Sequence, residues 1–423
     1  MTSKDWVSTE KQDKNSDQIE ELKNVPPIRF SVFTDEWKTY KLEDLFTSKK
    51  GAGLSKEKLN NNGKNKCILY GELYTEYNLL ISKVKSMTNS DEGTLSKKED
   101  ILIPASTTTK GEDLVTACIV LEDNIQLGGD ITILRTKNDK IINNLFFAYY
   151  FSNVLVKKIA PLTQGSTIIH LYWKDFKKVS IDLPLLGEQK KISYFLSLVD
   201  KKIELMEKKY EKVIQFKKSV LEKIFKKELN FKNNEWKTIK LKDIGQFYRG
   251  HSYNSSNVTQ RGLLVLRSNN IKNNKINLSE QLQFVNKDCK EELKLRKGDI
   301  VICMSNGSRK LVGKTGQYMG NYNGNLTVGA FCSIFRPKLG ISKFLFQTES
   351  YKKQLYLILA GTNINNLKNS DLENFSFEIP VVSDEIDNIC SFLDYIDNNI
   401  YSLEKKIEKI KEFKKYLLQQ MFV

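Results

Sequence analysis

Few side chains in this sequence have the types and spacing that catalysis requires. The histidines are His170 and His251, which excludes H-E-x-x-H metalloenzymes and most Ser-His-Asp constellations. Glu36–Lys38 and Glu235–Lys237 have the E-x-K spacing of nuclease metal sites, but neither has an identifiable distant acidic partner. A Trp that anchors the first strand of a domain explains both segments better. The sequence therefore predicts no catalytic, cofactor-binding or metal-binding residue in this chain.

Two glycine-containing segments resemble nucleotide-binding loops without meeting their requirements. Gly307–Thr315 has five residues between its glycines where a P-loop has four. Gly51–Gly53 lacks the third glycine and the acidic residue of a dinucleotide fold. Val25–Ile28 is the nearest match to the Asn/Asp-Pro-Pro-aromatic tetrapeptide of amino-methyltransferases, and it lacks the reactive residue. We expect these segments to be loops, and we expect the chain to bind a partner.

Loops that combine cations with small hydrogen-bonding residues and aromatics favour a nucleic-acid partner. Lys and Arg neutralise phosphates, whereas Arg, Asn and Gln can form paired hydrogen bonds with base edges. Taken singly, each such loop is more often an ordinary solvated loop. The candidate DNA-binding residues in the first half of the chain are Lys49, Lys50, Lys56, Lys64, Tyr70, Thr107, Thr108 and Lys110. Those in the second half are Arg249, Tyr253, Arg267, Ser268, Asn269, Asn270, Asn306, Ser308, Arg309, Lys310 and Lys314.

The composition agrees with a polyanionic partner. The 423 residues include 67 Lys and Arg and 51 Asp and Glu, which gives a net charge of +16. Nucleic acid is the first candidate for such a surface, ahead of an acidic membrane or an acidic protein. No apolar stretch approaches a membrane span or the core of a secretory signal, so we expect a cytoplasmic protein. Six scattered cysteines without a C-x-x-C pair predict neither disulfides nor a zinc site.

One long internal repeat organises the elements that must position these loops. Glu36–Thr39 returns almost 200 residues later as Glu235–Thr238, and Asp100–Ile103 returns as Asp299–Ile302. Two copies of one module account for nearly everything after the first 30 residues. Positions that agree between the copies indicate a common scaffold. The candidate loops differ almost completely, as expected of two domains that recognise two different sequences.

Each module begins with a β-rich part and ends with a helix. Short β-rich runs separated by Gly, Asn and Ser predict an α+β domain, with strands at 68–70, 101–103, 115–121, 131–135, 263–266, 300–303 and 331–335. The helices carry apolar residues alternately four and three positions apart. This predicted helix-pair seam comprises Ile192, Leu196, Val199, Ile203, Met206, Tyr210, Val213, Ile389, Leu393, Ile396, Ile400, Leu403, Ile407 and Ile410.

Both apolar stripes are interrupted in the same way. Lys217 and Lys414 occupy the next expected seam position, and each follows a Phe, Phe216 and Phe413. A shared interruption predicts matching geometry in the two helices. Packing of each helix on its own domain is the alternative, but pairing of the two helices better explains a seam of this length that occurs twice.

Several segments resemble the specificity (S) subunits of type I restriction-modification systems. The resemblance is carried by Gly165–Leu171, by Leu183–Ile192 with its Glu-Gln pair, and by Phe195–Ile203, and the start at Pro27–Trp37 also resembles that family. The second copy departs from the pattern where Asp384-Glu385 replaces the Glu-Gln pair and Asn363 replaces Thr167.

The resemblance implies an α+β fold with a pseudo-twofold internal repeat. Two α/β target recognition domains would alternate with two long helices that pair as an antiparallel coiled coil. We expect a flexible N-terminal tail at 1–26, target recognition domains at 27–185 and 230–381, a central conserved helix at 186–229 and a C-terminal one at 382–423.

The resemblance also implies a function. Each domain would recognise one half-site of a bipartite, asymmetric double-stranded DNA target. Two adenine-N6 methyltransferase (M) subunits would dock on the chain, and two restriction/translocase (R) subunits could join them. S-adenosylmethionine, ATP and Mg would be bound by those partners, so this chain would be a non-catalytic specificity subunit. The alternative is a coiled-coil assembly scaffold that binds acidic proteins without recognising a DNA sequence.

Overall fold

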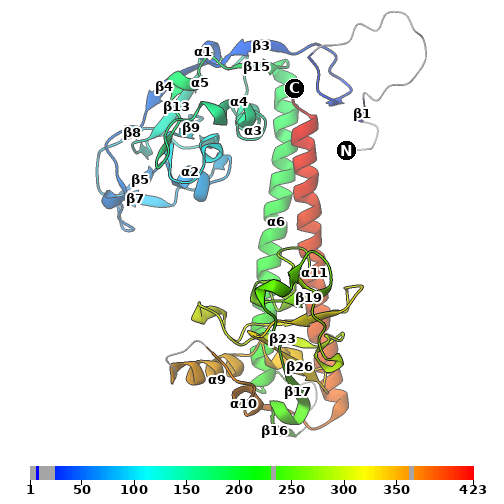
Figure 1. The fold of residues 1–423 in the computed structure, drawn as a ribbon. Coiled ribbons are helices and arrows are strands. Elements are labelled where there is room, and N and C mark those ends of the chain that lie inside the picture. The colour runs from blue at the N-terminus through cyan, green and yellow to red at the C-terminus, as the bar shows by residue number, and fades with distance from the viewer. Residues whose placement is uncertain (1–5, 9–23, 230–234, 362–365) are drawn as a thin grey trace, which may run out of the picture. The chain divides into compact units, whose positions relative to one another are not determined.

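The computed structural model describes residues 6–8, 24–229, 235–361 and 366–423 (Figure 1). The chain forms two units. The first contains residues 1–207 and 405–423, and the second contains residues 208–404. Each long helix of the chain therefore contributes one part to each unit.

The first unit is built on two larger sheets and three strand pairs, one of which joins β10 (Ser106–Thr107) to β14 (Ile169–His170). The five-stranded sheet has the order β4 (Phe46–Lys50), β13 (Ile131–Thr136), β9 (Ile101–Pro104), β11 (Cys118–Val120) and β6 (Leu80–Ile81). The four-stranded sheet has the order β7 (Ser86–Thr88), β5 (Asn65–Ile68), β12 (Gln126–Leu127) and β8 (Thr94–Leu95). Strands β3 (Lys38–Lys41) and β15 (Ser180–Leu183) pair antiparallel. The helices are α1 (Leu42–Leu45), α2 (Glu72–Thr75), α3 (Asn144–Asn153), α4 (Val156–Ile159) and α5 (Trp173–Phe176).

The second unit repeats this plan. Its larger sheet has the order β17 (Gly245–Arg249), β26 (Cys332–Pro337), β23 (Ile300–Cys303), β24 (Thr315–Gln317), β21 (Lys275–Ile276) and β20 (Ile271–Lys272). Its smaller sheet has the order β18 (Val258–Thr259), β22 (Phe284–Val285), β19 (Leu263–Leu266) and β25 (Leu326–Val328), and β16 (Trp236–Lys240) pairs with β27 (Ser376–Pro380). The helices are α7 (Leu241–Ile244), α8 (Ser342–Leu345), α9 (Glu349–Ala360) and α10 (Asn369–Glu373).

The internal repeat predicted from the sequence is present in the strand order. In both units three antiparallel pairings are followed by one parallel pairing, β11 with β6 and β24 with β21. The central strands β9 and β23 are buried on both faces. Alternate residues of a strand point to opposite sides, so each of these strands contributes side chains to two different cores. Ile101 and Ile103 join one core cluster while Leu102 joins another. Ile300–Cys303 is divided between two cores in the same way.

Some predicted strand limits need correction. The run 68–70 was predicted as a strand, but β5 ends at Ile68 because the amide of Leu69 donates to Glu72 Oε2 (2.7 Å) at the start of α2. The strand predicted at 115–121 covers Cys118–Val120, and the strand predicted at 331–335 begins at Cys332. Within the predicted tail, Trp6–Ser8 form β1, which pairs with β2 (Ile28–Phe30). Residues 1–5 and 9–23 lie outside the described part of the chain.

A buried ion pair lies at the start of each central strand. Arg135 donates two hydrogen bonds to Asp100 (2.7 and 2.8 Å), and Arg336 does the same to Asp299 (3.0 and 2.8 Å). Both carboxylates are only 2% exposed. Asp299 also accepts the backbone amide of Arg296 (2.9 Å). Each pair therefore joins the central strand to its neighbour β13 or β26 and to the turn before it.

The helices α6 (Leu186–Phe225) and α11 (Ser383–Gln420) begin within one residue of the predicted positions and end earlier than predicted. In the first unit, Ile192, Leu196, Val199 and Ile203 of α6 share a core cluster with Leu417 and Leu418 of α11. In the second unit, Val220, Leu221 and Ile224 of α6 share a core cluster with Ile389, Leu393 and Ile396 of α11.

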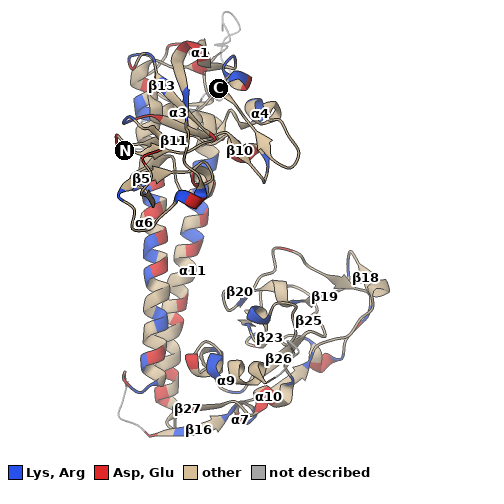
Figure 2. Ribbon diagram, turned by 90° about the vertical axis from the view of Figure 1, so that its left-hand side faces the viewer, with Lys and Arg blue, Asp and Glu red and all other residues tan. Residues whose placement is uncertain are grey.

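The two lysines that interrupt the seam form ion pairs between α6 and α11. In the first unit, Lys414 contacts Asp200 (2.6 Å), which also accepts the hydroxyl of Tyr149 (2.7 Å). In the second unit, Lys217 contacts Asp397 (2.6 Å). Elsewhere on α6, Lys is interspersed with Glu, whereas the charged residues of α11 before Lys405 are all Asp or Glu (Figure 2).

Replacement of Asp299 by Ala is expected to destabilise the second unit by about 3 kcal/mol, because Arg336 loses its buried partner. Urea unfolding measures this change. The control is Glu408→Ala, which breaks the exposed pair with Lys405 and is expected to cost less than about 0.5 kcal/mol. Equal effects of the two substitutions would show that the buried pair has no special structural role.

Candidate nucleic-acid interface

The predicted loops follow equivalent strands in the two units. In the first unit they lie at the ends of β4, β5 and β9, and in the second unit at the ends of β17, β19 and β23, with Lys49 and Lys50 inside β4 and Arg249 inside β17. Strands β4 and β9 both run antiparallel to β13, so their carboxyl ends lie at the same edge of the sheet. The same relation holds for β17 and β23 around β26. Most residues that were chosen for their types thus lie at matching strand ends in two copies of one fold, whereas Lys64 precedes β5 and lies apart from them.

In the first unit the turn before β13 joins these loops. Asp130 accepts the hydroxyl of Ser106 (2.7 Å), and its carbonyl accepts the amide of Ala105 (2.8 Å). The amide of Gly128 donates to Ile68 at the end of β5 (3.0 Å). A hollow of about 820 Å³ opens here. The residues that line it include Lys56, Leu69, Tyr70, Glu72, Tyr74, Lys85, Gly129 and Asp130.

The hollow brings together only part of the predicted set. Lys56 and Tyr70 line it, whereas the other six candidates of the first unit are absent from its lining among the described residues. Thr107 lies in the interior, and its hydroxyl is hydrogen-bonded to Thr109 Oγ1 (2.8 Å), so it shapes the loop. Lys50 places its ammonium over the ring of Tyr172, 5.1 Å from the centroid. The remaining candidates of this unit, Lys49, Lys64, Thr108 and Lys110, are exposed.

In the second unit, two of the predicted loops touch directly. Asn306 donates from Nδ2 to Ser268 Oγ (3.0 Å), which joins the loop after β23 to the loop after β19. Asn269 donates to Gln281 Oε1 (2.5 Å), and its own Oδ1 is buried without a hydrogen-bond partner. Asn270 is buried, and its Oδ1 accepts the amide of Arg267 (2.9 Å). Asn270 therefore holds the loop in shape, and it is Arg267 that faces solvent.

The exposed candidate residues of the second unit are mostly basic. Arg249, Arg267, Ser308, Arg309 and Lys310 are exposed, while Tyr253 and Lys314 are half-buried. The loop Gly307–Thr315, which the glycine spacing excludes as a P-loop, contains a short 3₁₀ turn at Arg309–Leu311. The exposed side chains of Arg309 and Lys310 in this loop can contact phosphates.

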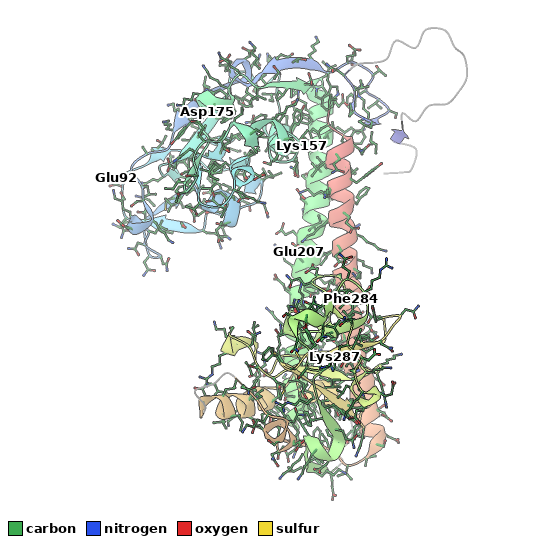
Figure 3. The ribbon with its side chains drawn as sticks, viewed as in Figure 1. Glu92, Lys157, Asp175, Glu207, Phe284 and Lys287 are labelled. Atoms are coloured by element: carbon green, nitrogen blue, oxygen red, sulfur yellow. The ribbon has the colours of Figure 1, made fainter. Side chains whose placement is uncertain are left out.

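Buried His251 adds no charge to this surface. Burial lowers the pKa of its imidazole, and the nearby ammonium of Lys287 lowers it further. Lys287 belongs to the second unit (Figure 3). The amide of His251 donates to Val328 (2.7 Å), so the residue anchors the loop after β17. His251 therefore has a structural role in this loop.

Two glycine pairs set how closely the loops approach one another. A Cβ on Gly51 would lie 1.9 Å from the carbonyl oxygen of Gly128, and a Cβ on Gly250 would lie 2.1 Å from that of Gly329. Backbone cannot move aside without shifting the strands. Gly51 and Gly250 occupy equivalent places after β4 and β17. Both units therefore need glycine at the point where the two sheets meet.

The turn before β13 and before β26 was not predicted from the sequence. Asp130 and Phe331 occupy equivalent positions in this turn, each one residue before the strand begins. Phe331 was predicted to belong to a strand, because phenylalanine is common in strands. The signal available in the sequence was the difference between the two copies at this position, where the first copy has Asp130 and the second has Phe331.

Trp37 is buried and packs against Phe146 (centroids 5.9 Å apart), as an anchor of the first strand requires. Trp236 is half-buried against Phe225. Among the described residues, no group of three or more His, Cys, Asp or Glu side chains could hold a metal ion. No helix in that part of the chain is long and apolar enough to cross a membrane.

The model of the type I restriction modification DNA specificity domain matches the sequence twice, at residues 34–215 and 233–412. The chain belongs to the type I restriction-modification specificity family. It is 26% identical over 420 residues to the type I restriction enzyme MjaVIII specificity subunit of Methanocaldococcus jannaschii, covering 91% of both chains. It is 31% identical over 164 residues to the EcoKI specificity subunit of Escherichia coli, covering 37% of this chain and 35% of that subunit.

Solved structures show the same fold. The S subunit from M. genitalium aligns with a TM-score of 0.61 and 16% identity, covering 92% of this chain and 96% of that one. A chain from a structure on complex assembly of the type I R-M system aligns with a TM-score of 0.54 and 15% identity, covering 91% and 97%. Each specificity-domain match combines one β-rich domain with most of the helix that follows it.

Gly250→Ala is expected to destabilise the second specificity domain by more than about 2 kcal/mol, because the new methyl group meets the backbone at Gly329. Thermal unfolding tests this. Gly307→Ala is the matched control in a neighbouring loop, since nothing lies within 4 Å of the Cβ position there. If both variants unfold at the parent temperature, the close approach is not a constraint on the fold.

Proposed function

We propose that this chain is the non-catalytic DNA-specificity subunit of a cytoplasmic type I restriction-modification complex. Each specificity domain recognises one half of a bipartite, asymmetric target. One observation carries the proposal: loops after equivalent strands, on matched scaffolds, differ in their side chains between the two domains. With β9 aligned on β23, exposed Arg309 and Lys310 of one domain correspond to Lys110 and Gly111 of the other. The matching family model is a DNA specificity domain, so DNA is the proposed target of these loops.

Positive charge and specific contacts have separate roles in this proposal. Phosphate contacts by lysines hold the domains on any duplex and weaken as salt rises. Arg267 and Arg309 are exposed on the second domain and have the paired donors that fit the major-groove edge of guanine. A target in two unequal halves follows, because the two domains do not offer the same donors and acceptors.

We propose that adenine methylation and restriction, with S-adenosylmethionine, ATP and Mg, belong to M and R partner subunits. Three of the four deeply buried acids in the described part of the chain have structural partners, whereas both carboxylate oxygens of Glu385 are buried without a hydrogen-bond partner. Asp100 and Asp299 pair with arginines, and Glu188 accepts two hydrogen bonds from Arg29 (2.8 and 2.7 Å). These carboxylates hold the scaffold together, which supports a binding role for the chain.

The two long helices are proposed to pair as an antiparallel coiled coil over their whole length. In the first unit the early part of α6 packs with the late part of α11, and in the second unit the late part of α6 packs with the early part of α11. Lys411 also contacts Glu207 (2.6 Å) in the first unit, where Glu207 lies on α6 (Figure 3). Val213 and Ile400 lie against the core of the second unit.

The outer faces of the helices are the proposed docking surfaces for two M subunits. Leu198 of α6 and Phe413 of α11 are exposed in the first unit, and Phe216 of α6 and Tyr395 of α11 are exposed in the second. These pairs are repeat equivalents with the helices exchanged, so each unit offers the same kind of apolar surface. Large exposed apolar side chains of this kind are typical of protein interfaces. R subunits would join through the assembled complex.

The alternative, a coiled-coil scaffold that binds acidic proteins, needs only the basic charge and the helices. It does not explain why the loops differ while their supporting strands repeat. It predicts equal binding to all DNA sequences.

Methylation mapping tests the function. The chain is expressed with its M subunit in a host that lacks adenine methylation, and methylated adenines are located across the genome. A bipartite motif with an unspecified spacer is expected, and Arg309→Ala or Arg267→Ala is expected to relax it in one half only, by roughly tenfold or more at one base pair. Lys310→Ala is the matched control that lowers methylation at all sites alike. Active M subunit without any motif would contradict the proposal.

Ile203→Asp combined with Ile400→Asp is expected to separate the helices, because each places a charge in the seam at a cost of more than about 3 kcal/mol. Leu205→Asp with Ser402→Asp is the control at equivalent exposed positions. Thermal unfolding followed by far-ultraviolet circular dichroism measures the difference. A seam double variant that unfolds at the same temperature as the control would show that the helices do not depend on this seam.

A further inference from the structure

Phe331 is the most exposed large hydrophobic side chain among the residues that the structure describes, with 71% of its surface accessible. It lies in the turn between β25 and β26 of the second specificity domain. A single exposed apolar side chain is ordinary on a protein surface. What sets Phe331 apart is its position among the proposed DNA-recognition loops and the rigidity of its backbone.

Backbone hydrogen bonds hold the turn in place. The carbonyl of Phe331 accepts the amides of Met304 (2.8 Å) and Ser305 (3.2 Å), at the beginning of the loop after β23. On the other side, the amide of Gly329 donates to Leu266 (2.8 Å), at the end of β19. The ring is therefore presented from a fixed backbone, so contact with a ligand costs little conformational entropy.

Three proposed DNA-recognition loops meet around this turn. The Phe331 carbonyl joins it to the loop after β23, which carries Asn306 and Arg309, and Leu266 joins it to the loop that carries Arg267. The loop after β17 meets the turn at Gly329, which faces the ring of Tyr253 and abuts Gly250. An apolar ring therefore stands among polar and basic side chains, where any duplex that these loops hold would meet it.

The first specificity domain has a different side chain at this position. Asp130 occupies the equivalent place and accepts the hydroxyl of Ser106 (2.7 Å). A carboxylate fits a hydrogen-bond donor such as the amino group of cytosine, whereas a phenyl ring fits the methyl group of thymine. The same turn of the scaffold thus offers opposite chemistry in the two domains.

We propose that Phe331 is a specificity-determining residue that contacts the 5-methyl group of a thymine in the major groove of the half-site recognised by the second domain. The inference rests on the proposed function and adds a residue and a base to it. The neighbouring Arg267 and Arg309 are exposed and have the hydrogen-bonding groups that suit major-groove base edges. Apolar wedges that unstack bases act from the minor groove, so these neighbours favour an edge contact with the methyl group.

The test compares thymine with deoxyuridine, which lacks only the methyl group. The assembled chain and M subunit bind duplexes that carry the mapped motif, with each thymine of the second half-site replaced in turn. The parent complex is expected to lose roughly fivefold in affinity at one position, the value of one buried methyl group. Phe331→Ala is expected to bind the thymine and deoxyuridine duplexes equally. Met319→Ala, which removes another exposed apolar side chain of the same domain, is expected to keep the parent's preference.

Several results would overturn the inference. Phe331→Ala could keep the parent's thymine preference at every position, or lose affinity equally for all DNA sequences. A second half-site without any A·T pair would also contradict it. A rise in 2-aminopurine fluorescence that requires Phe331 would show that the ring unstacks bases, which excludes an edge contact. Failure of the proposed function is distinguishable, because the parent complex itself would then bind no bipartite motif preferentially.

Discussion

The central strand of each domain is the constraint on which the other elements depend. β9 and β23 are buried on both faces, so each must supply side chains to two cores at once. A one-residue slip would exchange the two faces and place each side chain in the wrong core. The Asp–Arg pair at the start of each strand opposes such a slip, because the carboxylate meets both the neighbouring strand and the preceding turn. The loop at the opposite end of the strand is then held in a defined place, and that loop carries the proposed recognition residues.

A second constraint lies in the helices and is also repeated. Lys414 with Asp200, and Lys217 with Asp397, place the same charge pair at two sites that the repeat relates to one another. A shift of either helix by one turn would separate four partly buried charges from their ionic partners, and separation of such charges is destabilising. Each lysine buries less apolar surface than an apolar residue would at the same seam position. Its ion pair instead favours one register of α6 against α11. The surrounding networks differ, since Asp200 also holds Tyr149 while Lys217 also donates to Gln347 (2.7 Å).

The repeat and the helices could be predicted from the sequence because both are periodic. Spacing of Ile192, Leu196 and Val199 is enough to place a helix, and agreement between Asp100 and Asp299 is enough to place a shared scaffold position. Phe331 and Thr107 could not be placed in this way. Whether each side chain is buried depends on turns that are closed by hydrogen bonds between segments far apart in the chain. Residue type alone favours a buried Phe331 and an exposed Thr107, whereas the structure has the reverse. The loops themselves were identified by residue type, but which side chains face outward depends on where the two sheets meet at the glycine pairs.

Charge and specificity are separable in this molecule because charge acts alike on every duplex. A net charge of +16 raises affinity for any phosphate backbone and cannot by itself distinguish one sequence from another. Discrimination must therefore come from side chains whose energy depends on the base, and these must be held by a backbone rigid enough that a wrong base cannot be accommodated by a shift of the loop. The turn before β26 meets that requirement through its three backbone hydrogen bonds, and the turn before β13 meets it through Asp130 and Ser106. Two rigid turns with opposite chemistry on one repeated scaffold are sufficient to make the two half-sites unequal.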